Sequence, residues 1–189
     1  MKFLRSVTLL SVGIITMACA QRPATPLVMA MALSSSSFED GGIIPPKFTR
    51  SAETPVSPSL AWTGVPQNTM TFALILHDPE VPVKNTAEDV VHWLIFNIPG
   101  ATTHLSEGVP VGAKLPDGSI QGTTLAGTLG YMAPGARADG PYHHYIFELY
   151  ALDTKLDLGP EAHRADLFKA MEGHVLAKGV LTGRYHRLQ

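Results

Sequence analysis

Three runs of β-branched and aromatic residues constrain the fold of this chain more than any other feature. They cover Thr71–His77, Val90–Ile98 and His143–Leu152, and each is bounded by proline, glycine or aspartate. Such runs are typical of β-strands. The stretches that join them are rich in turn formers, above all Gly100–Gly140, and the chain carries 15 prolines and 17 glycines in 189 residues. We therefore expect a mainly β fold built from antiparallel strands.

One helix is predicted near the C-terminus. Residues Glu161–Glu172 follow Pro160, and Gly173 suits the end of a helix. Three apolar side chains share one face of this segment: Leu167, Ala170 and Met171. The closing segment Val175–Tyr185 is apolar but interrupted by glycines. No second linker follows residue 29, so residues 29–189 are expected to form one domain, and an apolar content of 45% is enough for its core.

The N-terminal residues have the pattern of an export signal. Lys2 and Arg5 precede the mostly apolar run Val7–Met17, which is too short to span a bilayer comfortably. The small residues around Cys19 then form a cleavage site before Gln21. We therefore expect residues 1–20 to be a signal peptide, residues 21–28 to be a linker, and the mature protein to be periplasmic or secreted.

Cys19 is the only cysteine, so no disulfide can form within the chain. Two interpretations compete for it. It is removed with the signal peptide, or it is the lipidated first residue of a membrane-anchored lipoprotein. Thr16 stands where lipidation normally requires leucine, which favours removal. A membrane is an expected partner only in the second case. A formal net charge of -2 gives no basic surface for nucleic acid.

Three ionisable residues lie at or near the ends of the predicted strands. Side chains alternate across a strand, so residues two apart share a face. By this rule Asp78 falls in step with Leu76, His143 falls in step with Tyr145, and His92 falls in step with Leu94, Phe96 and Ile98. Buried groups of this kind need partners. Alternation alone leaves two interpretations open: three separate core residues with satisfied hydrogen bonds, or one site at a common end of the sheet.

A set of short motifs, in order along the chain, resembles the phosphatidylethanolamine-binding protein family in its bacterial, Raf-kinase-inhibitor-like branch. The motifs are Asp78-Pro79-Glu80-Val81-Pro82, His92-Trp93, Phe96-Asn97-Ile98-Pro99, Gly130-Tyr131 and His143-His144-Tyr145. Each is weak alone, but the ordered set is specific. Supporting pieces extend the resemblance from about Met29 to Arg187.

This resemblance implies two antiparallel sheets with short helices, one near the C-terminus, and one anion pocket. The family's pocket residues fall on Asp78, His92 and His143, with Tyr131 and Pro134 in the rim segment. Family members bind phosphate, phosphoryl-ethanolamine headgroups or similar oxyanions, and some regulate a kinase or a protease, so a protein partner is a second expectation. No cofactor is implied. The family commonly has arginine where this chain has His144, so the headgroup preference is not carried over.

The chemistry of such a pocket follows from its residue types. Imidazole N–H groups donate to phosphate oxygens, more strongly once protonated. Asp78 either fixes the tautomer of a histidine or accepts from a protonated phosphate or an ammonium group. Two enzymatic alternatives remain: a metal site, since two histidines and a carboxylate can hold iron, and a weak hydrolase. Neither a helical metal motif nor a Gly-x-Ser-x-Gly motif occurs, so we expect a binding protein without catalytic or metal-ligating residues.

Overall fold

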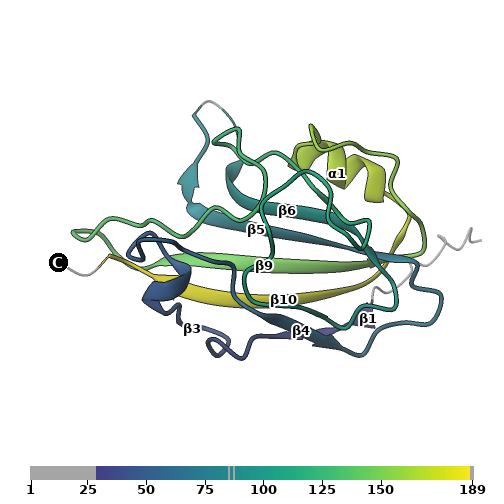
Figure 1. Cartoon of the computed structure of the whole chain (residues 1–189), viewed down its shortest axis with the longest axis horizontal. Helices are drawn as coiled ribbons and strands as arrows, with labels where there is room; N and C mark the ends of the chain where they lie inside the picture. The colour runs from purple at the N-terminus through teal and green to yellow at the C-terminus, as the bar shows by residue number, and fades with distance from the viewer. Residues whose placement is uncertain (1–28, 85, 87, 188–189) are drawn as a thin grey trace, which may run out of the picture.

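Strands dominate the secondary structure (Figure 1). The computed structural model describes residues 29–84, 86 and 88–187, so the expected signal peptide, Cys19 and the linker 21–28 lie outside the described residues. The elements are β1 (Met29–Ala30), β2 (Ala32–Ser34), β3 (Gly42–Ile43), the 3₁₀ helix η1 (Pro46–Phe48), β4 (Leu60–Thr63), β5 (Thr71–Pro82), β6 (Asp89–Pro99), β7 (His104–Leu105), β8 (Ile120–Gln121), β9 (His143–Leu152), α1 (Arg164–Met171) and β10 (Val175–Tyr185).

The strands form two sheets. The larger sheet has the order β1-β10-β9-β5-β6-β8 with β3 also beside β10, and the smaller has the order β2-β4-β7. The prediction of a mainly β protein with two sheets and a helix near the C-terminus is confirmed. The long central pairs are antiparallel, whereas the short strands β1 and β3 join β10 in parallel. Strands of two residues carry no periodicity that the sequence could reveal.

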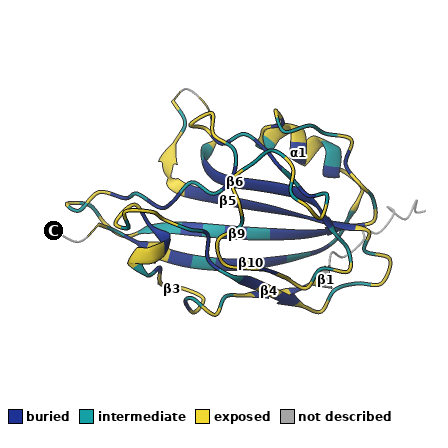
Figure 2. Cartoon of the chain, in the orientation of Figure 1, coloured by how far each residue is buried: buried dark blue, intermediate teal, exposed yellow. Residues whose placement is uncertain are grey.

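Two apolar layers flank the larger sheet, and Figure 2 shows its central strands as mostly buried. One face packs against the smaller sheet, where Trp62 meets Phe72. The opposite face packs against α1 through Leu167 and Met171. Among the described residues, none of the helices has the length and apolar content needed to cross a membrane.

The ends of three elements differ from the prediction: β5 continues to Pro82 instead of ending at His77, β6 is one residue longer at each end, and α1 is shorter. Helix α1 begins at Arg164 rather than Glu161, because the Asp166 carboxylate accepts the backbone N–H of His163 and caps the first turn there. Strand β10 takes up the whole closing segment despite its glycines. A Cβ on Gly183 would lie only 2.4 Å from Cγ1 of Ile44, so glycine is what allows the segment after β3 to pack directly on this strand.

Two β-bulges in β6 overturn the alternation expected for that strand. Leu76 pairs with Trp93 and His77 pairs with Val91, which leaves His92 as the extra residue. A second register shift lies between Phe72 and Leu74, opposite Asn97, whose φ is 57°. Because each bulge places two consecutive residues on one face, Leu94 and Phe96 face α1, while His92 turns to the other face with Trp93. His92 therefore shares a face with Asp78 and His143, but not for the reason that alternation suggested.

Candidate functional site

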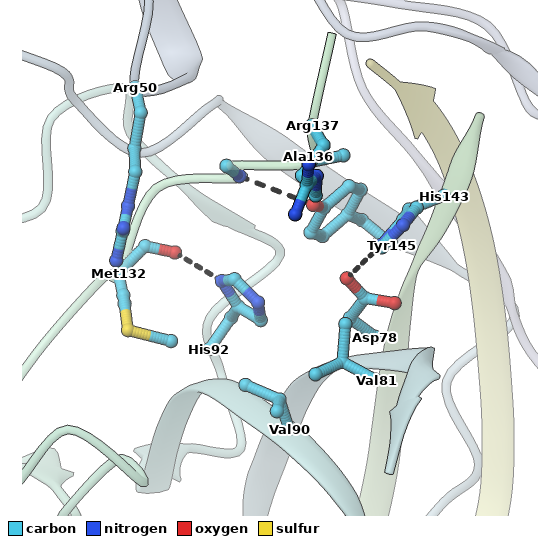
Figure 3. A pocket seen from close by; sticks show the side chains of 11 residues that line it. Arg50, Asp78, Val81, Val90, His92, Met132, Ala136, Arg137, His143 and Tyr145 are labelled. Carbon is cyan, nitrogen blue, oxygen red and sulfur yellow. Dashed lines mark hydrogen bonds and ion pairs between the residues drawn. The ribbon is translucent and has the colours of Figure 1, made fainter. Parts of the chain in front are cut away.

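A cavity of about 280 Å³ lies over the ends of β5, β6 and β9 (Figure 3). Its walls are Arg50, Asp78, Val81, Val90, His92, Met132, Gly135, Ala136, Arg137, His143 and Tyr145. The larger sheet thus brings together the three ionisable residues that the sequence placed near strand ends. They come from three adjacent strands, and register and bulges aim them into the same space.

Asp78 and His143 form a hydrogen-bonded pair in one wall. Asp78 is 2% exposed, and its Oδ2 accepts from Nδ1 of His143 at 2.8 Å. Its Oδ1 accepts the backbone N–H of Glu80 at 3.0 Å. An ionised carboxylate only accepts, so the proton of a neutral His143 is held on Nδ1. Nε2 is left without a hydrogen bond to any described residue. This is the first of the two roles expected for Asp78, the fixing of a histidine tautomer.

His92 forms the facing wall and is also held in one tautomer. Its Nδ1–H donates to the carbonyl oxygen of Met132 at 2.8 Å, and the N–H of Met132 donates back to the carbonyl of His92. Figure 3 shows the other ring nitrogen turned toward the centre of the cavity. Burial lowers the pKa of His92 below its usual 6.5, opposed by the Met132 hydrogen bond and the charge of Asp78. At neutral pH, Nε2 of His92 is therefore an acceptor, and it becomes a donor only when the ring takes up a proton.

Tyr145 lies between the two imidazoles. Its ring meets that of His92 edge-on at 5.1 Å and stacks at 6.5 Å from that of His143. The hydroxyl accepts the N–H of Gly135 at 3.2 Å. Burial, followed by the negative charge of Asp78, raises the pKa of Tyr145, so the hydroxyl keeps its proton. Tyr145 therefore adds a neutral hydroxyl to the wall of the cavity, close to Asp78.

Two arginines supply positive charge that the motifs did not reveal. Arg50 packs flat on Gly135, where an added Cβ would come within 2.6 Å of Cδ of the arginine. Its charge reaches the cavity and adds to the lowering of the His92 pKa. Arg137 lies at the exposed mouth and is held by two hydrogen bonds from its guanidinium to Asp139. Asp78 and Asp139 together balance the two arginines, so this group carries no net charge while both imidazoles are neutral.

The other sequence-predicted residues lie beside the cavity rather than in its lining. Tyr131 donates its hydroxyl proton to the carbonyl of Phe48 at 2.7 Å and packs edge-on against Trp93. Pro134 is buried, and its carbonyl accepts the N–H of Arg50. Both therefore support the segment that carries Gly135 and Arg137. His144 points away, because both its ring and its backbone N–H bond to Glu80.

One edge of this cavity holds residues of the kind that bind metal cations. Among the described residues, one group of metal-type ligands comes together: Asp78, Glu80 and His143. Its carboxylates already accept from the two neighbouring histidines. A metal ion would have to replace those hydrogen bonds. The arrangement differs from the two-histidine site considered from the sequence, since Glu80 takes the place of His92.

A sequence signal existed for two of the three lining residues with polar or charged side chains that the prediction missed. Tyr145 shares the strand face of His143, so alternation could have placed it here. Arg137 stands three residues after Pro134, in the rim segment that the resemblance implied. Arg50 carried no signal, because its place depends on the absence of a side chain at Gly135, far away in the sequence.

Comparisons with known proteins agree with this architecture. The sequence profile of the family described as "Phosphatidylethanolamine-binding protein" matches residues 34–186. A UPF0098 protein of Methanothermobacter thermautotrophicus is 47% identical over 157 residues, which cover 83% of this chain and 99% of the relative. A UPF0098 protein of Pyrococcus horikoshii is 38% identical over 155 residues, or 81% of this chain and 75% of the relative.

Solved structures give the same result. The crystal structure of a putative phosphatidylethanolamine-binding protein homologue from Chlamydia trachomatis superposes with a TM-score of 0.72 at 32% identity, over 84% of this chain and 98% of the other. The structure of E. coli YbcL, described as a member of the mammalian PEBP family, gives a TM-score of 0.70 at 28% identity, over 83% and 98% of the two chains. The chain belongs to the phosphatidylethanolamine-binding protein family.

Proposed function

We propose that this protein is an exported binding protein that holds a phosphate-type anion in the cavity between His92 and His143. The observation that supports it most is the arrangement of the two imidazoles. Each Nδ1 bonds to the protein, to Met132 in one case and to Asp78 in the other, so each Nε2 is left for a ligand. A protonated ring then presents a charge-assisted donor to an oxyanion.

The charges of the lining support the same conclusion. Arg50 and Arg137 balance Asp78 and Asp139, and protonation of both imidazoles would raise the net charge from zero to two. The negative charge of Asp78 is partly used within the protein, since one of its oxygens accepts from His143 and the other accepts from the backbone N–H of Glu80. A zwitterionic headgroup such as phosphoryl-ethanolamine would bring an ammonium partner for this carboxylate. The site therefore suits free phosphate and phosphoryl headgroups alike.

Titration calorimetry with inorganic phosphate tests the proposal. Two or three charge-assisted hydrogen bonds of about 1.5–3 kcal/mol each, set against the cost of association, predict a Kd between roughly micromolar and millimolar. His143→Ala should weaken binding about tenfold or more, because it removes one of these donors. His104→Ala, an exposed histidine outside the cavity, is the matched control and should leave binding unchanged. Equal binding by both variants would place the anion elsewhere.

The proposal of export is supported by the N-terminal sequence pattern. N-terminal sequencing and mass measurement of the mature protein should find Gln21 as the first residue. A mature protein that begins at an acylated Cys19 would instead be a membrane-anchored lipoprotein, which would still be an exported protein. Recovery of the intact chain from the cytoplasm alone would contradict export.

A further inference from the structure

A second group of buried polar residues lies on the face of the larger sheet opposite the anion cavity. His77 is 6% exposed and shares its strand face with Ala73 and Ile75, which pack against α1. Its Nδ1 lies 2.6 Å from Oδ2 of Asp89 in β6, and Arg164 of α1 pairs with the other oxygen of this carboxylate. One carboxylate thus joins β5, β6 and α1 behind the anion cavity.

The ring of His77 makes this hydrogen bond at one nitrogen only. Its Nε2 is buried without a hydrogen-bond partner among the described residues, and Oε2 of Glu148 is 3.9 Å away. That carboxylate already accepts from Lys178 and Tyr150. A buried polar atom without a partner costs free energy, which an aliphatic side chain would avoid. An aliphatic side chain could not, however, bond to Asp89, so this bond is what the histidine contributes.

The bond between His77 and Asp89 depends on how β6 pairs with β5. His77 pairs with Val91, and the next residue of β6, His92, is the extra residue of a bulge. Asp89 stands two residues before Val91 and therefore lies on the same face, which is the face covered by α1. Diagonal neighbours on one face of a strand pair are within reach of long side chains, which is how His77 meets Asp89.

Regular pairing without the bulge would turn these residues over. A shift of one residue exchanges the two faces of a strand. Val91 would then face the cavity and His92 would face α1. Asp89 would leave the face on which His77 lies. The bond between His77 and Asp89 is therefore compatible only with the bulged register. On the cavity side, the two hydrogen bonds between His92 and Met132 hold the same register.

We propose that His77 and Asp89 are positioning residues for anion binding, which hold the register of β6 that turns His92 into the anion cavity. In this role they deepen the proposed function, on which the inference rests. Neither side chain lines the cavity, so both act on a ligand only through His92. Their effect on anion affinity should therefore vanish when residue 92 has no imidazole.

A double-mutant cycle tests this dependence. Inorganic phosphate is titrated by calorimetry at about pH 6 into the wild type, His77→Leu, His92→Ala and the double variant. His77→Leu should weaken binding about tenfold or more, as the loss of one charge-assisted hydrogen bond does. In the His92→Ala background the same substitution should change the affinity by less than about twofold. Equal losses in the two backgrounds would overturn the inference.

A conservative variant provides the rescue. His77→Asn places an amide N–H near the position of Nδ1, from which it can still donate to Asp89. Its phosphate affinity should lie within about threefold of that of the wild type, because the register is kept. A loss in His77→Asn as large as that in His77→Leu would show that the bond to Asp89 is not the cause and would overturn the inference.

Hydrogen exchange separates a change of register from a general loss of stability. The N–H of Met132 donates to the carbonyl of His92, so it reports the register of the bulge without any ligand. Its exchange should be about tenfold faster or more in His77→Leu than in the wild type, while the amides of β10 keep their protection. Unchanged exchange at Met132, or equally faster exchange in all strands, would contradict the positioning role.

His174 and Asp153 provide the matched control, because they form a bond of the same kind, 2.8 Å long, at the other end of β9 and β10. His174→Leu should leave both phosphate affinity and Met132 exchange unchanged, and losses equal to those in His77→Leu would overturn the inference. If His77→Leu does not fold, Asp89→Ser removes the same bond from a partly exposed position and should give the same results. Failure of the wild type to bind phosphate would refute the proposed function, whereas Met132 exchange would still test the register.

Discussion

The protonation of His92 should control anion binding. Because Nδ1–H is held by the Met132 carbonyl and burial lowers the pKa, the neutral ring presents a lone pair to the cavity at pH 7. An anion oxygen can bind at Nε2 only if the ring takes up a proton, because Nε2 then becomes a hydrogen-bond donor. Affinity should therefore increase as the pH falls, by up to about tenfold per unit, and level off below the pKa of His92.

The size of the effect follows from a single charge-assisted hydrogen bond. A contribution of about 1.5–3 kcal/mol corresponds to a total gain of roughly 10- to 150-fold between the neutral and the protonated ring. The same pKa has the opposite consequence for the empty protein. A histidine whose folded pKa is lowered opposes charging, so the stability due to neutral His92 is complete above 6.5 and decreases as the pH falls below that value. A bound anion should offset this loss.

Two variants separate the two ring nitrogens. His92→Asn keeps an amide donor near the position of Nδ1, within reach of the Met132 carbonyl, but has no group at Nε2. His92→Gln places an amide near Nε2 and loses the Met132 bond, at a cost of about 1 kcal/mol in unfolding free energy. We expect His92→Asn to bind weakly with a reduced pH dependence, and His92→Gln to bind with intermediate strength and an equally reduced pH dependence.

The assay is calorimetric titration with sulfate between about pH 8 and about pH 5.5, because sulfate stays fully ionised there whereas a phosphoryl group changes charge near pH 6. Urea unfolding at the same pH values reports stability. The measured quantity is the difference in affinity between the wild type and His92→Asn at each pH. An identical pH profile in the two proteins would refute the role assigned to His92.

Three further perturbations test other parts of the structure. Asp78→Asn should weaken phosphoryl-ethanolamine more than phosphate, because only the first offers an ammonium partner; calorimetry with the two ligands should show unequal losses. Gly135→Ala should lower phosphate affinity about three- to tenfold by displacing Arg50. Gly140→Ala is the control, because an added Cβ there would lie 3.9 Å from its nearest neighbour and displace nothing. Equal phosphate affinities of the two variants would show that Arg50 does not contribute to the site. Burial raises the pKa of Glu148, but hydrogen bonds from Lys178 and Tyr150 outweigh burial and lower this pKa below 4.5. The stability that ionised Glu148 contributes is therefore present above pH 4.5 and is lost as the pH falls below 4.5. Glu148→Gln should therefore remove part of the acid sensitivity measured by urea unfolding, and an unchanged profile would contradict this.

Much of the fold could be predicted from the sequence because the central strands are long and carry strong local signals. Strand β9 has the bounds that its β-branched and aromatic residues indicated, and β6 differs by one residue at each end. The helix was found but begins three residues later, since a single side chain, Asp166, sets its first turn. The parallel strands β1 and β3 were missed, because two residues that pair with a distant strand have no pattern of their own.

The residue types of the site could also be predicted, but their mutual geometry could not. The sequence alone determined that Asp78, His92 and His143 stand near strand ends and that an ordered set of motifs surrounds them, because strand alternation and motif order are local properties. The face on which His92 lies was decided by a bulge, which depends on how β6 pairs with β5. Arg50 reaches the cavity because it packs on Gly135, and His144 lies outside the cavity because its ring bonds to Glu80. These contacts join residues far apart in the chain, and only the tertiary structure fixes the distances at which charge and hydrogen bonding act.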